Sequence, residues 1–211
     1  MSKKVLSLSL SVELDEKEYK DMMARATLFG KNINKALASA YKRAASAGKA
    51  ETKRQLSSEY TLPSTEIGKT ITSKATSKEA WLRISSSAIP IIKFKGVAPK
   101  TVMPPTKGPV KAEIKKGEGG TLKRAFVAKM KAGDKFHIGV FERESEKRKS
   151  KDTAGNEDAK SKAKWHINEH FGPATPGMLK ENDAARKAVI SKMKETLNTR
   201  VKHELGRLLN A

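Results

Sequence analysis

The chain has 211 residues and a formal net charge of +21, from 44 lysines and arginines against 23 aspartates and glutamates. Only 37% of the residues are hydrophobic and 5% aromatic, so we expect a thin core or one shared with neighbouring chains. Such a charge favours a polyanionic partner or an acidic protein surface, although a well-solvated basic protein would carry it too.

The composition and the N-terminus exclude several classes of protein. The absence of cysteine excludes disulfides and thiolate metal sites. The first residues alternate leucine with serine, unlike the continuous apolar segment of a secretory signal. No stretch approaches the roughly 18 apolar residues of a membrane-spanning helix, so we expect a soluble protein without a membrane partner.

The first sixty residues predict one strand and two helices. In residues 5–14 leucine or valine alternates with serine or glutamate, which is typical of a half-buried strand. Asp15 is the expected N-cap of a helix that ends near Leu28. A break at residues 30–32 precedes a second helix over residues 33–59.

The second helix combines a small-residue stripe with a basic surface. The stripe consists of Ile33, Leu37, Ala40, Tyr41, Ala44 and Gly48. Its small side chains allow a partner element to approach closely. Residues 31–58 hold seven bases and one acid, and we single out Lys42 and Arg43 as contacts for DNA or an acidic partner. A solvated helix face is the alternative.

Short elements follow this helix. Pro63 is the expected first residue of a short helix, with Ser64 or Thr65 helping to cap it. Residues 69–77 and 80–87 are expected to form a pair of strands.

Proline interrupts the next segment. Pro90 makes residues 88–95 an edge strand or a loop. Three prolines make residues 96–108 an extended arm, either a flexible linker or a contact with a neighbouring subunit.

The chain is organised around residues 109–143. We expect a strand over 109–116, a glycine turn, a basic segment over 121–131, a second turn, and a strand over 136–143. Residues 91–135 contain twelve bases and three acids, the densest positive region of the chain. Phe126 and Val127 are expected to pack on the core. The basic side chains expected to face DNA or an acidic neighbour are Lys123, Arg124, Lys129 and Lys131.

The C-terminal third predicts a loop, a helical turn and a long helix. Residues 145–164 lack large apolar side chains and predict an exposed polar loop. A helical turn carrying Trp165, Ile167 and Phe171 would dock on the core and stop at Gly172–Pro173. A final helix over about 178–209 follows, with an apolar stripe. The residues that we assign to a subunit interface are Trp165, Phe171, Gly172 and Pro173.

No pattern in the sequence indicates catalysis or a bound cofactor or metal. His166, Glu169 and His170 match the H-x-x-E-H pattern of one class of zinc protease, but Gly172–Pro173 would cut the helix that the pattern needs. Partly exposed histidines at a subunit contact are the preferred interpretation. The glycines of residues 117–120 lack the spacing of a nucleotide-binding loop and indicate a hairpin.

The order of several motifs resembles the minor tail protein Z family of long-tailed bacteriophages, the tail completion proteins. The resemblance spans about residues 33–180. The matching segments are 60–63 (YTLP), 89–94 (IPIIKF), 110–117 (VKAEIKKG), 125–130 (AFVAKM), 139–141 (GVF) and 169–178 (ExFGPxTPxM). Phe171 before Gly172–Pro173 fits the family pattern, whereas the polar insert after residue 144 is longer than expected.

The resemblance implies a structural virion protein without enzymatic activity. Such a protein is made in the host cytoplasm and lies at the neck, the head-proximal end of the tail. Related proteins form homo-oligomeric rings, commonly hexameric. The implied partners are a tail terminator or tail tube protein, a head-tail connector or adaptor, and double-stranded DNA in the channel.

Together these patterns predict an α+β fold in a single tail-completion domain, residues 1–211. A small, mostly antiparallel sheet would be packed by the long N-terminal helices and the C-terminal helix. The first functional hypothesis is a tail completion or neck protein that joins tail to head connector around the DNA channel. The alternative is a sequence-independent nucleic-acid-binding protein that acts outside a virion.

Overall fold

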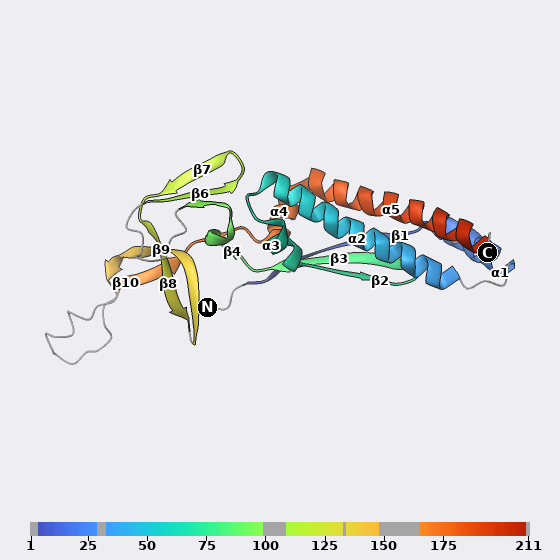
Figure 1. The fold of residues 1–211 in the computed structure, drawn as a ribbon, viewed down its shortest axis with the longest axis horizontal. Coiled ribbons are helices and arrows are strands. Elements are labelled where there is room, and N and C mark those ends of the chain that lie inside the picture. Colours follow the sequence, from blue (N-terminus) through green and yellow to red (C-terminus); the bar gives the residue numbers. More distant parts are fainter. Residues whose placement is uncertain (1–3, 29–32, 99–108, 133, 148–164, 210–211) are drawn as a thin grey trace. The chain divides into compact units, whose positions relative to one another are not determined.

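The computed structural model describes residues 4–28, 33–98, 109–132, 134–147 and 165–209 (Figure 1). The fold is α+β, as predicted, with antiparallel sheets and long helices. The sequence predicted one domain, whereas the contacts divide the chain into two compact units. Unit 1 comprises Met1–Glu59, Pro63–Ala88 and Pro173–Ala211, and unit 2 comprises Tyr60–Leu62 and Ile89–Gly172.

Unit 1 contains one three-stranded antiparallel sheet. Its strands are β1 (Leu6–Glu13), β2 (Ile71–Ala75) and β3 (Glu79–Ser86), in the order β1-β3-β2. The alternation in β1 places Leu10 and Val12 in the core, with Leu10 opposite Leu82 of β3. Leu6 belongs to the same face but is 42% exposed, so the core covers only the second half of β1.

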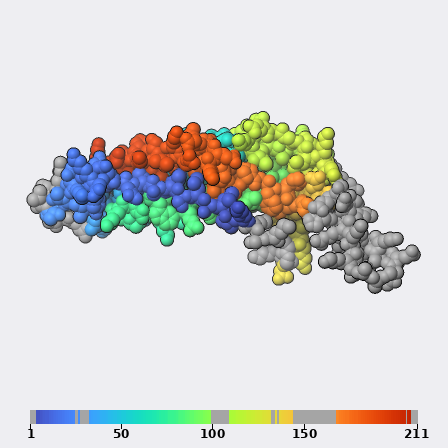
Figure 2. Space-filling model, turned by 180° about the vertical axis from the view of Figure 1, so that it is seen from behind, coloured from blue at the N-terminus to red at the C-terminus, as the bar shows by residue number. Residues whose placement is uncertain are grey.

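Long helices cover this sheet. The helices of unit 1 are α1 (Glu16–Leu28), α2 (Ile33–Glu59), α3 (Ser64–Lys69), α4 (Thr175–Glu181) and α5 (Asp183–Leu209). Asp15 caps α1 as predicted, because its Oδ1 accepts a hydrogen bond from the Lys17 amide at 2.9 Å. Figure 2 shows α5 and β1 side by side on one face of unit 1, where they are in contact.

The predicted small-residue stripe of α2 is buried, and α5 packs against α2. At Gly48 a Cβ atom would lie 2.5 Å from Met193 Cγ of α5 and 2.9 Å from Leu82 Cδ1 of β3. Only glycine therefore lets α2, α5 and β3 meet at this point. About two turns earlier, the buried hydroxyl of Tyr41 accepts a hydrogen bond from the Leu14 amide at 3.0 Å, and burial raises the pKa of Tyr41.

Two helix boundaries in unit 1 differ from the prediction. The final helix is not continuous from residue 178, because Asn182 separates α4 from α5. Asn182 Oδ1 accepts a hydrogen bond from the Ala185 amide at 2.8 Å, so its side chain starts α5 as a cap. The short helix α3 begins after Pro63, which occupies the capping position without any side-chain cap.

Unit 2 is built from short antiparallel strands. They are β4 (Ile89–Pro90), β5 (Gly96–Ala98), β6 (Val110–Lys115), β7 (Glu118–Leu122), β8 (Ala125–Ala132), β9 (Lys135–Lys147), β10 (Trp165–Glu169) and β11 (Phe171–Gly172). They form sheets in the orders β5-β6-β7, β10-β9-β8 and β11-β4, and a 3-10 turn, Ile91–Lys93, follows β4. The turn predicted between β6 and β7 contains Gly117, whose φ of 81° favours glycine.

Pairing with β9 overturns the helical turn predicted for residues 165–171. This segment forms β10 and β11, with Glu169 opposite Phe141 and Gly172 opposite Ile89. Distant strands thus supply the hydrogen bonds that a local helix would otherwise make.

Three other predicted boundaries in unit 2 are corrected. The basic segment over 121–131 belongs to β7 and β8. The predicted polar loop, 145–164, starts too early, because β9 extends to Lys147 and residues 148–164 lie outside the described part. The predicted arm, 96–108, begins as strand β5, and residues 99–108 also lie outside it.

Candidate interaction surface

One face of the β8–β9 hairpin changes from core to surface along its length. Val127 and Val140 face each other and are completely buried. The next pair on this face is Lys129 opposite Ile138, and the pair after it is Lys131 opposite Phe136. We call these last four residues the hairpin patch.

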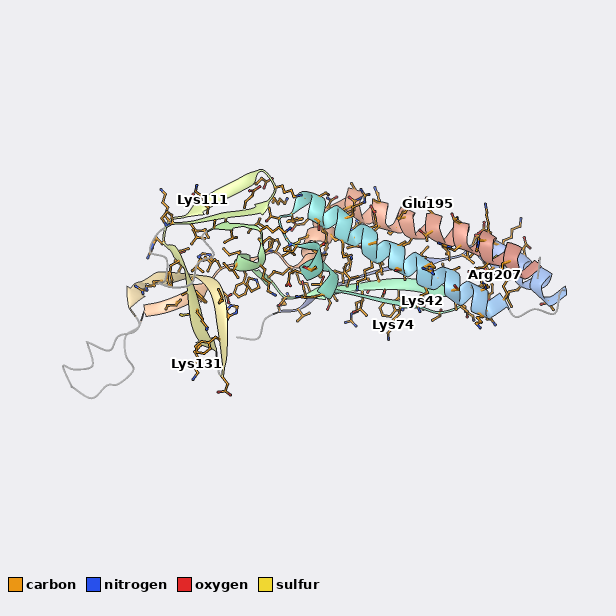
Figure 3. The ribbon with its side chains drawn as sticks, in the orientation of Figure 1. Lys42, Lys74, Lys111, Lys131, Glu195 and Arg207 are labelled. Carbon is orange, nitrogen blue, oxygen red and sulfur yellow. The ribbon has the colours of Figure 1, made fainter. Side chains whose placement is uncertain are left out.

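The hairpin patch is exposed and combines apolar with cationic side chains. Phe136 is 64% exposed and Ile138 is 42% exposed. Lys129 and Lys131 are exposed beside them, and Lys131 projects near the hairpin end in Figure 3. Lys129 Nζ lies 4.5 Å from the centroid of the Phe136 ring, within the range of a cation–π contact.

On the other face of the hairpin a half-buried histidine contacts a glutamate. His137 Nε2 and Glu169 Oε1 are 2.5 Å apart. The Glu169 carboxylate lies over Gly139, where a Cβ atom would come within 2.8 Å of Glu169 Oε1 and 2.9 Å of Phe141 Cζ. Gly139 therefore makes room for both the carboxylate and the aromatic ring. Phe126 is half-buried on this face, 6.2 Å from Phe141 between ring centroids, so of the two residues predicted to pack on the core, only Val127 is fully buried.

The other predicted cations of this hairpin lie in the turn between β7 and β8. Lys123 is exposed. Arg124 is engaged within the unit, since it donates a hydrogen bond to the Arg143 carbonyl at 3.2 Å and its Nε lies 3.7 Å from Glu142 Oε1. Lys123, Lys129 and Lys131 are therefore more available to a partner than Arg124.

Glu169 and His170, two residues of the zinc-protease pattern, contact different partners in the structure. Because neighbouring strand residues face opposite sides, Glu169 reaches His137 while His170 reaches Glu142, with 3.0 Å between His170 Nε2 and Glu142 Oε2. The side chain of His166 lies outside the described part. Among the residues that the structure describes, no group of three or more histidine or acidic side chains is placed to hold a metal.

Lys42 and Arg43 belong to unit 1 and are exposed on α2, where Figure 3 labels Lys42. Other bases of this helix have partners inside the unit. Lys49 donates a hydrogen bond to the Ile71 carbonyl at 2.9 Å, and Arg54 binds Glu51 through two hydrogen bonds. The structure thus brings Lys129 and Lys131 together in one patch and places Lys42 and Arg43 in the other unit.

The residues assigned to a subunit interface have mixed surroundings. Gly172 is buried, and a Cβ atom there would lie 2.8 Å from the ring of Phe94, so Gly172 has an internal packing role. Phe171 and Pro173 are half-buried. The side chain of Trp165 lies outside the described part. An interface at these residues stays a prediction.

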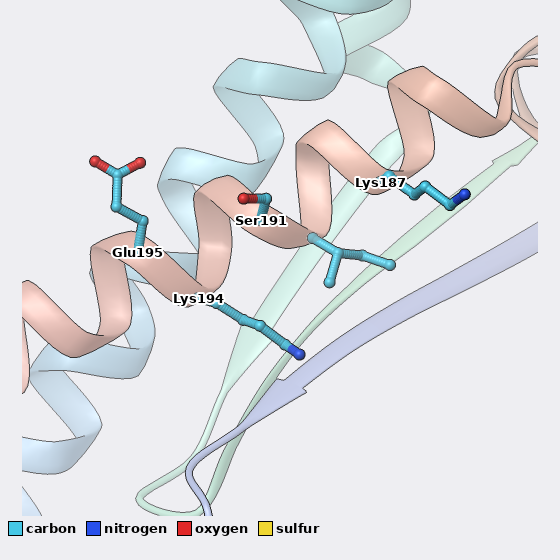
Figure 4. Close-up of a pocket in the computed structure, with 5 residues that line it drawn as sticks. Lys187, Ser191, Lys194 and Glu195 are labelled. Atoms are coloured by element: carbon cyan, nitrogen blue, oxygen red, sulfur yellow. The ribbon is translucent and has the colours of Figure 1, made fainter.

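Two shallow surface depressions lack a group of side chains suited to catalysis. The first, about 380 Å³, lies on α5 around Ile190 and Ser191, with Lys187, Lys194 and Glu195 (Figure 4). A hydrogen bond from Lys187, followed by one from Arg186, holds the pKa of the nearby Asp183 below its usual value.

The second depression, about 390 Å³, lies on the sheet β5-β6-β7. Small residues such as Gly96, Ala98 and Gly119 line it, together with Lys95 and Lys111. Neither depression contains a nucleophile paired with a base, so the hairpin patch is the stronger candidate for function.

Comparisons with known proteins found no significant match to a protein-family model, a curated protein or a solved structure. No helix within the described residues is both long and apolar enough to cross a membrane.

Phe136 and Ile138 are the residues of the candidate surface that the sequence analysis missed. The sequence predicts both residues within an apolar strand, and only the structure shows that their side chains are exposed. A usable signal was present, because Lys129 and Lys131 share their alternating face across a short turn.

Proposed function

We propose that the chain is a tail completion or neck protein of a long-tailed bacteriophage. It assembles as a homo-oligomeric ring at the head-proximal end of the tail and joins the tail to the head connector around the DNA channel. In this role it is structural and has no catalytic site.

The proposal is supported by hydrogen bonds in unit 2 that join parts of the resemblance motifs. The Thr61 amide donates to the Ile114 carbonyl at 2.9 Å, and the Thr61 carbonyl accepts a hydrogen bond from the amide of Lys95, the residue after segment 89–94, at 3.0 Å. The Ile91 amide donates to the His170 carbonyl at 3.1 Å. Segment 60–63 is thus joined to segment 110–117, and segment 89–94 to segment 169–178, although the members of each pair lie far apart in the chain.

The strand edges of unit 2 fit assembly with other chains. In the described sheets, β8 and β10 are the outer strands of one sheet, and β5 and β7 are those of another. Outer strands present unpaired amide and carbonyl groups that a neighbouring chain can pair with. A closed ring would cover such edges with copies of the same surface.

The basic surface outside the hairpin patch fits a channel that passes DNA. Lys123 of unit 2 and Lys42 and Arg43 of unit 1 are exposed. Lysines that contact phosphate bind without reading base sequence, which suits a channel through which any sequence passes.

The decisive experiment deletes the gene from the phage genome that encodes the chain. We expect heads and full-length tails that do not join, and joining restored when the purified protein is added. Electron microscopy of the restored particles should place a labelled copy of the chain at the neck. Normal joined particles from the deleted phage would reject the proposal.

The exposed lysines also support the alternative, a sequence-independent nucleic-acid-binding protein outside a virion. This alternative predicts that the isolated chain binds duplex DNA with an affinity that falls steeply as salt increases. The neck proposal instead predicts little binding by the isolated chain at moderate salt and a ring when tail proteins are present. Fluorescence anisotropy over a salt series and negative-stain microscopy separate the two.

A further inference from the structure

Phe136 of the hairpin patch is a large aromatic side chain that is exposed to solvent although it belongs to the regular strand β9. Phe136 is directly paired with Lys131 across the hairpin, and Ile138 with Lys129. Two residues further along the same face, Val140 is completely buried. Adjacent exposed apolar side chains on a paired strand are characteristic of an interaction site.

The charge around these apolar side chains is mainly positive. Lys129 lies over the Phe136 ring and Lys131 is beside it. The described carboxylate on this face is Glu142, opposite Ala125 at the far end of the hairpin, where Arg124 and His170 engage it. The exposed turn residue Asp134 offsets only part of the positive charge.

We propose that the hairpin patch docks onto an acidic protein surface that contains an apolar pocket. Phe136 enters the pocket as the central anchor, and Ile138 packs against its rim. Lys129 and Lys131 pair with carboxylates around the pocket. This arrangement of an aromatic anchor with charged groups at its edge is common at the centres of protein interfaces.

The same features disfavour other partners. A second copy docked through the same patch would bring its own Lys129 and Lys131 close to these two lysines. The phosphates of a nucleic acid would pair with the lysines, but they would leave Ile138 exposed. One face of the Phe136 ring is already covered by the Lys129 ammonium, which obstructs the stacking of a base.

The inference goes beyond the proposed neck function and does not depend on it. It concerns the chemistry of one partner surface and holds whether or not the chain forms a ring.

The test measures binding of the full chain to defined probes by fluorescence anisotropy. The main probe is a labelled twelve-residue peptide of alternating glutamate and leucine. A peptide with every leucine replaced by serine tests charge alone. Duplex DNA and vesicles of phosphatidylserine test the other anionic partners.

Four variants assign the binding to the patch. Phe136→Ser should weaken binding of the glutamate–leucine peptide roughly tenfold, since it removes an aromatic anchor. It should leave binding of the glutamate–serine peptide unchanged. Lys129→Gln should weaken binding of both peptides. The matched controls are Val5→Ser, which changes an apolar side chain that is 65% exposed, and Lys111→Gln, which changes an exposed lysine of β6.

The proposal is supported if the parent chain prefers the glutamate–leucine peptide and only Phe136→Ser removes that preference. Equal binding of both peptides would overturn it, as would an unchanged preference in Phe136→Ser. Phe136-dependent binding to vesicles or DNA that exceeds binding to the peptide would also overturn it, in favour of a lipid or nucleic-acid partner.

Discussion

The two units bury their apolar residues in different ways. Unit 1 places long helices on one sheet, and small residues such as Gly48 let α2 and α5 approach each other. Unit 2 has several short sheets, and its glycines make room for large side chains. Gly172 admits the ring of Phe94, and Gly139 admits Glu169 and Phe141. In the first unit a helix glycine makes room for the aliphatic side chains of Met193 and Leu82, and in the second unit strand glycines make room for aromatic rings and a carboxylate.

This difference bears on where each unit can offer a binding surface. Among the described side chains, the exposed large apolar residues of unit 1 are Val5, just before β1, and Leu6, its first residue. Those of unit 2 are Phe136 and Ile138, which lie within the β8–β9 hairpin and pair with Lys131 and Lys129. An apolar side chain held at a fixed register is preorganised for a partner, and this lowers the entropic cost of binding.

The largest expected effect is in the aromatic packing of unit 2. Phe94→Ala removes a completely buried ring and should lower the free energy of unfolding by about 3–5 kcal/mol, through lost burial and a new cavity. Hydrogen exchange should show the loss in β4 and β11. The control is Phe136→Ala, the same change at an exposed ring, which should cost less than about 0.5 kcal/mol. Similar costs for the two variants would contradict the distinction between packed and exposed rings.

The next effect tests the close packing of side chains against Gly48 in unit 1. Gly48→Ala should destabilise by about 2 kcal/mol, because the new methyl group overlaps Met193 and Leu82 and outweighs the better helix propensity of alanine. Gly206→Ala in α5 is the matched control, since no atom lies within 4 Å of the added Cβ. It should stabilise by up to about 1 kcal/mol. Urea denaturation measures both variants, and a stabilised Gly48→Ala would show that the helices can move apart at little cost.

A smaller effect tests the close packing around Gly139. Gly139→Ala should cost about 1–2 kcal/mol, since the methyl group displaces the Glu169 carboxylate and the Phe141 ring. The ring resonances of His137 in an NMR spectrum should shift as its partner moves. Gly120→Ala in β7 meets no neighbouring atom and serves as the control. If the two variants have the same stability, Gly139 has no role in packing.

The helices and the sheet of unit 1 were largely predictable, because long periodic patterns determine them. The bounds of α2 and its buried stripe match the prediction, as does the Asp15 cap. The break at Asn182 was missed because the apolar stripe continues past it. Asn182 also donates a hydrogen bond to Glu59 Oε2 at 2.7 Å, a contact between residues far apart in the chain.

Unit 2 was less predictable because its elements depend on distant partners. Residues 165–171 contain a helix-compatible spacing of large side chains, but pairing with β9 and β4 makes them strands. The candidate surface has the same limitation. The exposed lysines were predictable from charge, whereas the exposure of Phe136 and Ile138 depends on which elements cover the hairpin.

The smallest effect concerns charge rather than shape, at Glu51 of α2. Glu51 is 9% exposed, and Arg54 and Gln55 donate hydrogen bonds to its carboxylate. The hydrogen bond from Arg54 is the main cause that lowers the pKa of Glu51 below its ordinary value of 4.5. Glu51→Gln keeps the shape but loses the charge, and should destabilise by about 1 kcal/mol at pH 7.

The lowered pKa of Glu51 determines how its contribution to stability changes with pH. Because the folded state lowers the pKa of Glu51, its stabilisation is complete above the ordinary value of 4.5 and is lost as the pH falls through the lower folded value. The stability difference between the parent and Glu51→Gln should therefore be constant from pH 7 to about pH 5 and shrink below pH 4.5. Urea denaturation at each pH measures it, and Glu195→Gln, at an exposed carboxylate of α5, is the control. A difference that stays constant down to pH 3 would assign the effect of Glu51 to packing, the mechanism that Gly48 illustrates in the same helix.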